Sequence, residues 1–141
     1  MDQSAACEGI FISHEHSDHI AGLQQLLKRF DIPVYTNQGT WREIQDKLIV
    51  PKNQLIELTK GSLTLGNLIV EPFALSHDAA DPIGINVFAG KDKATVVTDT
   101  GVISDSILRR MDDTTLLVLE ANYDPHMLRF GPYQPFLKQR V

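Results

Sequence analysis

The amino-acid sequence predicts an α/β (α+β) domain in which sheets are covered by helices. Two observations lead to this class. Apolar residues recur at helical spacing in the first third of the 141-residue chain, whereas its middle consists of short apolar and β-branched runs separated by glycines and prolines. The expected order is strand, helix, strand, helix, several strands, helix, strand, which suits a layered domain.

The first elements surround a histidine-rich segment. Residues 9–13 form a short apolar run, which predicts a buried strand that leads into a loop. A helix is expected over residues 18–30, because its apolar residues share one helical face: Ile20, Leu23, Leu26, Leu27 and Phe30. Ser17 is the expected N-cap of this helix.

The middle of the chain is rich in strand signals. After a short strand at 33–36 comes a helix at 40–48, with Trp41 among its core-facing residues. The runs that follow predict four strands, at 55–58, 63–75, 83–89 and 93–99, with a hairpin turn at 90–93.

The last third returns to helical spacing. A helix at 104–111 is expected to turn Ile107, Leu108 and Met111 inward. The run at 115–120 is apolar enough to predict a strand that is buried on both faces. Short helical turns are expected within 124–141.

Composition narrows the class of protein. The formal net charge of −5 does not indicate a nucleic-acid binder by bulk charge. The single cysteine, Cys7, excludes a disulfide within the chain and agrees with a reducing cytoplasm. No apolar run reaches the roughly 18 residues of a membrane span, and the N-terminus lacks the basic and apolar stretches of a signal peptide. A cytoplasmic protein without membrane contact is therefore expected.

The segment Ser13–His19 places three imidazoles and a carboxylate within six positions. In extended backbone, side chains two residues apart point the same way, so His14 and His16 can bind one ion together. Asp18 and His19 lie where the loop becomes a helix and can face a second ion. Imidazole nitrogens and carboxylate oxygens suit zinc, iron or manganese.

The pattern His-x-His-x-Asp-His resembles the signature of the metallo-β-lactamase superfamily. The resemblance implies an αββα sandwich with two divalent metal ions, zinc first, with manganese or iron as alternatives. It also implies that His77 completes the first site with His14 and His16. Asp99 would bridge this ion and a second ion that is held by Asp18 and His19.

Further segments resemble the bacterial YycJ/WalJ group, namely residues 11–23, 35–37, 39–41, 76–79, 98–101, 119–124 and 127–133. The resemblance implies a cytoplasmic 5′→3′ exonuclease, with DNA as substrate and partner, that uses a metal-activated water. Asp18 is the catalytic candidate, because it could orient that water or shuttle its proton. Glu120 either orients a ligand histidine or is an ordinary carboxylate at a strand end. The candidates for substrate contacts are Ser76, Asn122, Arg129, Tyr133, Lys138 and Arg140.

Members of the group are longer than this chain, so residues 1–141 are expected to be a partial metallo-β-lactamase domain with one sheet edge uncovered. The strands before the first motif and a final ligand histidine in a Gly-His segment would be missing. His126 matches the segment before that ligand and not the ligand itself.

Two rival functions stay open. One is a small-molecule metallohydrolase acting on a thioester, lactone or β-lactam, and the other is an inactive metal-binding fragment. A diiron oxidoreductase is disfavoured, because those relatives carry Glu where His16 stands. The sequence does not decide the oligomeric state.

Overall fold

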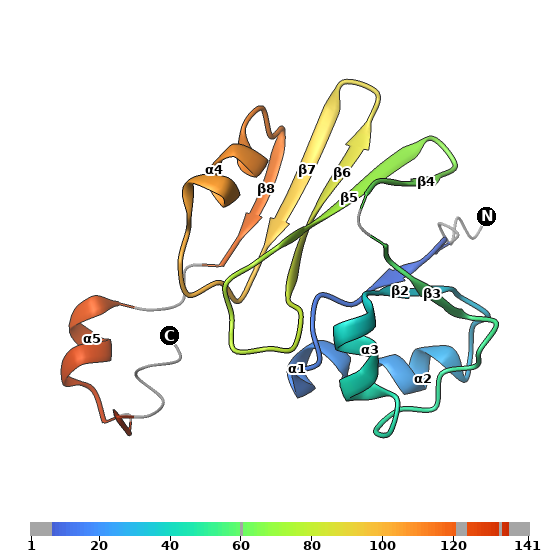
Figure 1. Cartoon of the computed structure of the whole chain (residues 1–141), viewed down its shortest axis with the longest axis horizontal. Helices are drawn as coiled ribbons and strands as arrows, with labels where there is room; N and C mark the ends of the chain where they lie inside the picture. The colour runs from blue at the N-terminus through green and yellow to red at the C-terminus, as the bar shows by residue number, and fades with distance from the viewer. Residues whose placement is uncertain (1–6, 60, 121–123, 133, 136–141) are drawn as a thin grey trace, which may run out of the picture.

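The computed structural model describes residues 7–59, 61–120, 124–132 and 134–135, which form two β-sheets accompanied by helices (Figure 1). The predicted α/β (α+β) class is confirmed, and so is the expected order of elements. Within the described residues, no helix is long and apolar enough to cross a membrane.

The first sheet is parallel and has three strands in the order β1 (Ile10–Phe11), β2 (Val34–Thr36) and β3 (Leu55–Glu57). Parallel neighbours need crossover connections, which commonly contain helices. Here these helices are α1 (Ser17–Ile20), α2 (Leu23–Leu27) and α3 (Gln38–Ile44). Sheet and helices share one buried apolar cluster, formed by Ile12, Ile20, Leu23, Val34 and Ile44. Trp41 packs against this cluster, as predicted.

Helix boundaries in this layer differ from the sequence prediction. The helix expected over 18–30 is divided at Ala21–Gly22, where glycine is a poor helix former. Ser17 is not an N-cap, because the helix already includes it and leaves His16 at the cap position without a side-chain hydrogen bond. α3 begins before the predicted Thr40, since Asn37 Oδ1 accepts the Thr40 N–H at 2.9 Å and caps the helix there.

The second sheet has five strands in chain order. β4 (Leu63–Leu65), β5 (Leu68–Ala74), β6 (Ile83–Ala89) and β7 (Asp92–Val97) are antiparallel neighbours. The run predicted as one strand at 63–75 is interrupted by Gly66, whose φ of 56° turns the chain between β4 and β5. The hairpin predicted at 90–93 is confirmed with a shorter turn, because Ala89 already pairs with Asp92.

The last strand of this sheet corrects a prediction. β8 (Leu116–Leu119) runs parallel to β7 after α4 (Asp105–Met111), and it lies at the edge of the sheet. Its four apolar residues are 42–61% exposed and are not buried on both faces. An edge strand has a neighbour on only one side, and only α4 accompanies this end of the described sheet (Figure 1). Leu108 of α4 is likewise exposed, whereas Ile107 is buried as predicted.

The two sheets meet through a second apolar cluster, formed by Tyr35, Leu58 and Ile83 with flanking residues from β1 and β4. The Ile83 N–H donates to the Ser13 carbonyl at 3.1 Å, which ties the start of β6 to the loop after β1. Three connections lie where the second sheet meets the helical layer: the β1–α1 loop, the β5–β6 loop and the β7–α4 loop. α5 (Pro125–Phe130) lies apart from these loops (Figure 1).

Candidate metal centre

The β1–α1 loop supplies the first histidines. His14 and His16 lie on its extended part, and the His14 Nε2 and His16 Nδ1 atoms are 3.0 Å apart. His14 is almost fully buried, at 1% exposure. The backbone then enters α1, and the His19 N–H donates to the His16 carbonyl at 3.0 Å. This turn brings the His19 ring back onto the His14 ring, with 4.0 Å between the ring centroids.

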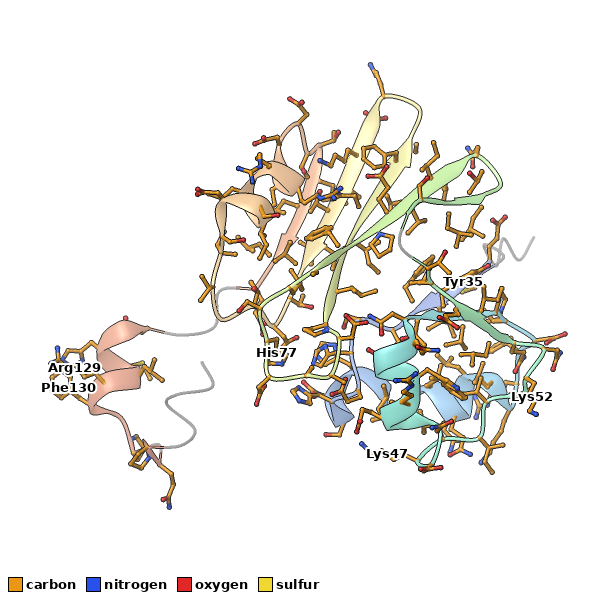
Figure 2. All side chains as sticks on the ribbon, viewed as in Figure 1. Tyr35, Lys47, Lys52, His77, Arg129 and Phe130 are labelled. Carbon is orange, nitrogen blue, oxygen red and sulfur yellow. The ribbon has the colours of Figure 1, made fainter. Side chains whose placement is uncertain are left out.

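The β5–β6 loop adds a third histidine to the first pair. His77 Nε2 lies 3.1 Å from His16 Nδ1, although the two residues are 61 positions apart in the chain. Figure 2 shows His77 at the end of the second sheet that faces the helical layer. One nitrogen from each of His14, His16 and His77 lies within 4.8 Å of the others. Tetrahedral zinc with Zn–N bonds of about 2.0–2.1 Å would separate its ligand atoms by roughly 3.4 Å, so these nitrogens fit one ion.

A second group of donors shares His14 with the first. His19 Nε2 lies 2.8 Å from Asp99 Oδ2, and ligand atoms of His14, His19 and Asp99 all lie within 4.8 Å of one another. Asp18 is not in either group. Its side chain is 77% exposed, and its Oδ2 atom is 3.5 Å from His19 Nε2.

In three of the four histidines, the ring nitrogen that faces away from these groups has a partner of its own. Ser13 Oγ lies 3.1 Å from His14 Nδ1 and 3.2 Å from His19 Nδ1. His77 Nδ1 lies 3.4 Å from Asp78 Oδ1. Such partners select the tautomer and fix the ring orientation of histidines that bind metals. Sequence reasoning did not assign these roles to Ser13 and Asp78; the available signal was their position next to His14 and His77.

The position of Asp99 is set by its backbone conformation and by a hydrogen bond from its backbone N–H. The residue has a φ of 54°, a left-handed conformation that aspartate tolerates better than most residues. Its N–H donates to the Glu120 carboxylate at the end of β8. Glu120 was expected either to orient a ligand histidine or to be an ordinary carboxylate at a strand end. The structure shows that it contacts the loop that carries the candidate carboxylate ligand.

The electrostatic environment keeps His14 neutral. Burial above all, together with positive charge on His19, His16 and His77, lowers the pKa of His14 from 6.5 to about 4, while the Asp99 carboxylate opposes the shift. A neutral imidazole offers a lone pair, which is the form that binds a metal. Several imidazoles and a carboxylate around one buried point therefore suit a divalent cation.

Two of the six candidates for substrate contacts, Ser76 and Arg129, lie within the described part of the chain. The Ser76 side chain is exposed, while its carbonyl accepts the Gly101 N–H at 2.8 Å. Arg129 lies on α5, well away from His77 in Figure 2. The other four lie outside the described residues: Asn122, Tyr133, Lys138 and Arg140.

Comparison with protein families gives one match that covers nearly the whole chain. The family described as "Beta-lactamase superfamily domain" matches residues 1–136. The chain is 38% identical over 135 residues to exodeoxyribonuclease YycJ of Bacillus anthracis, covering 94% of this chain and 51% of that protein. It is 32% identical over 139 residues to exodeoxyribonuclease WalJ of Streptococcus pneumoniae serotype 2, covering 95% and 51%. The chain thus spans about half the length of these relatives.

Solved structures agree on the fold. The metallo-β-lactamase fold protein YhfI from Bacillus subtilis matches with a TM-score of 0.70 at 20% identity, over 82% of this chain and 50% of that one. A diphosphatase from the PhnP family matches with a TM-score of 0.67 at 22% identity, over 81% and 47%. Zn²⁺-bound PqqB from Methylobacterium extorquens also reaches 0.67, at 18% identity, over 90% and 50%. At these identities the likeness shows the fold alone.

Proposed function

Because this chain belongs to the β-lactamase superfamily domain family, we propose that it is a metal-dependent hydrolase that cleaves phosphodiester bonds of DNA as a 5′→3′ exonuclease. One observation carries the proposal: two groups of metal-ligand atoms converge and share His14. The relatives named exodeoxyribonuclease supply the substrate class. The chain covers 51% of their length, so its own activity is part of the proposal.

Two divalent ions are proposed for the centre. His14, His16 and His77 would hold the first ion, and Asp18 with His19 the second, with Asp99 as the bridging carboxylate. The nitrogen-rich first group favours zinc, and manganese and iron are the alternatives. The family fold implies a divalent metal, and the structure provides a histidine–aspartate cluster to hold it.

When bound, such ions activate water as a nucleophile and offset negative charge on a phosphodiester. The protein's own part is to orient the donors and move a proton. Ser13 and Asp78 lie beside the outer nitrogens of three histidines and would set their tautomers. Asp18 is also the proposed catalytic residue, because a carboxylate next to His19 and the second ion could orient the attacking water or accept its proton.

The test separates metal binding from catalysis. The 141-residue chain is stripped with a chelator, reloaded with Zn²⁺ or Mn²⁺, and analysed for metal per chain. Cleavage is then followed on DNA labelled at its 3′ end, with bis-p-nitrophenyl phosphate as a small phosphodiester. His77→Ala is expected to lose metal and cleavage. His126→Ala, on the exposed side of α5, is the matched control and should retain both.

Three results would count against parts of the proposal. Equal metal content in wild type and His77→Ala would refute the assignment of the site. Metal binding with turnover of a thioester, lactone or β-lactam but of no phosphodiester would favour the small-molecule hydrolase. Metal binding without turnover of any of these compounds would indicate an inactive metal-binding chain.

A further inference from the structure

The loop that carries His77 is tied to the first layer through the backbone of two consecutive residues, Ala80 and Asp81. The Ala80 N–H donates to Glu15 Oε1 at 2.7 Å. The carbonyl of the next residue, Asp81, accepts a hydrogen bond from Asn37 Nδ2 at 2.5 Å. The side chains that bind this segment come from two other loops, 65 and 44 residues away in sequence. We call this arrangement the Ala80–Asp81 clamp.

One side of the clamp is built into the histidine loop itself. Glu15 stands between His14 and His16, so the loop that supplies two donors also holds the loop that supplies the third. Glu15 Oε2 is buried and has no hydrogen-bond partner among the described residues. Burying a carboxylate oxygen without a partner is costly. The hydrogen bond from the Ala80 N–H to Glu15 Oε1 offsets part of this cost and holds the carboxylate against the His77 loop.

The other side of the clamp uses the start of α3. Asn37 Oδ1 accepts the Thr40 N–H, and this hydrogen bond orients the amide so that Nδ2 faces the Asp81 carbonyl. Gly39 allows the close approach, because a Cβ placed there would lie 2.5 Å from the Asp81 Cβ. The motifs at 35–37 and 39–41, to which sequence reasoning gave no role, contain this asparagine and this glycine.

We propose that Glu15 and Asn37 are positioning residues that place His77 against His14 and His16. The proposal rests on the metal site proposed above. His77 Nε2 lies 3.1 Å from His16 Nδ1, and an ion tolerates only small deviations in the positions of its ligand atoms. Backbone contacts restrain the two ends of the loop, where the Gly101 N–H donates to the Ser76 carbonyl and the Ile83 N–H donates to the Ser13 carbonyl. Between these ends, the clamp binds the segment through side chains of the first layer.

Conservative variants distinguish the positioning of His77 from a general contribution of Glu15 and Asn37 to the stability of the fold. Glu15→Ala removes the acceptor for Ala80, whereas Glu15→Gln keeps an amide oxygen at the same place. Asn37→Asp keeps the oxygen that caps α3 but replaces the donor to Asp81 with a second oxygen. Glu57→Ala and Asn53→Asp, both at exposed positions, are the matched controls.

The first measurement is Zn²⁺ affinity, by competition with a chromophoric chelator. Loss of residues that orient metal ligands typically lowers affinity by about 10–100-fold. Glu15→Ala and Asn37→Asp are expected to fall in this range, and Glu15→Gln and both controls should stay at the wild-type affinity. Circular dichroism checks that each variant is folded. If Asn37→Asp does not fold, the comparison of the alanine and glutamine variants at Glu15 still decides the proposal.

The second measurement uses metal-free protein and so does not depend on the proposed function. Amide exchange at Ala80 should accelerate in Glu15→Ala, and the ring resonances of His77 should shift while those of His126 do not. Unchanged exchange, unchanged His77 resonances and wild-type Zn²⁺ affinity would overturn the clamp. A wild-type protein that binds no Zn²⁺ would refute the proposed function, whereas the exchange rate of Ala80 would still test the clamp.

Discussion

Acid should destabilise the metal-free protein through His14. Burial is the main cause that lowers the pKa of this residue from 6.5 to about 4. The unfolded chain therefore binds a proton at His14 near pH 6.5, while the folded protein does so only near pH 4. The stability associated with a neutral His14 is fully present above pH 6.5 and is lost as the pH falls through this window.

The size of the effect follows from the two pKa values. One pKa unit corresponds to about 1.36 kcal/mol, and the shift from 6.5 to about 4 therefore corresponds to about 3 kcal/mol. The net stability of a domain is typically about 5–15 kcal/mol. Protonation of this one imidazole could thus remove a large fraction of the free energy of unfolding.

The assay is urea unfolding in the presence of a chelator, at several pH values between 7 and 4. Wild type is compared with His14→Ala, because other groups that titrate in this range are common to both proteins. Wild type is expected to lose about 3 kcal/mol more than His14→Ala across this range. His126→Ala, which removes an exposed imidazole, should follow wild type.

The result that would refute this reasoning is a parallel pH dependence in wild type and His14→Ala. It would mean that His14 takes up its proton at the same pH in the folded and unfolded states. The conclusion that burial keeps His14 neutral would then be wrong, and the electrostatic reason to expect that His14 is ready to bind a cation would fall with it.

Three further predictions concern the site, the core and the sheet edge. Ser13→Ala should lower Zn²⁺ affinity by about 10–100-fold in chelator competition, because two ring nitrogens lose a partner; Ser106→Ala is the control, and equal affinities would disprove the role of Ser13. Ile44→Ala should cost about 2–5 kcal/mol in urea unfolding, against less than about 0.5 kcal/mol for exposed Ile49→Ala; similar losses would contradict the core assignment. Leu117→Lys on exposed β8 should reduce concentration-dependent association in sedimentation, and an unchanged profile would argue against this edge as a contact.

The candidate metal ligands and the fold class could be predicted well before the structure was known. The grouping of His14 and His16 depends on side chains two residues apart in extended backbone, and the structure brings their ring nitrogens within 3.0 Å. His77 and Asp99 came from the resemblance, and the structure places both beside the first motif. The α/β class was predictable because residue periodicity reflects which face of an element is buried.

Features that depend on contacts between residues far apart in the sequence, or on the position of a strand in its sheet, were harder to predict. β8 has the composition of a buried strand, but its position at the sheet edge leaves it exposed. Glu120 contacts the backbone of Asp99, a pairing across 21 residues that no local pattern indicates. The candidates for substrate contacts stay predictions, and only Ser76 and Arg129 among them lie within the described residues.

The sequence alone determined the types of donor at the candidate centre and the strand and helix periodicities around them, because these properties are encoded within a few neighbouring residues. Only the tertiary structure decided that Glu15 and Asn37 hold the His77 loop and that Ser13 lies beside two ring nitrogens. Such contacts depend on strand register and on how the two sheets pack, and these are set by the whole chain at once.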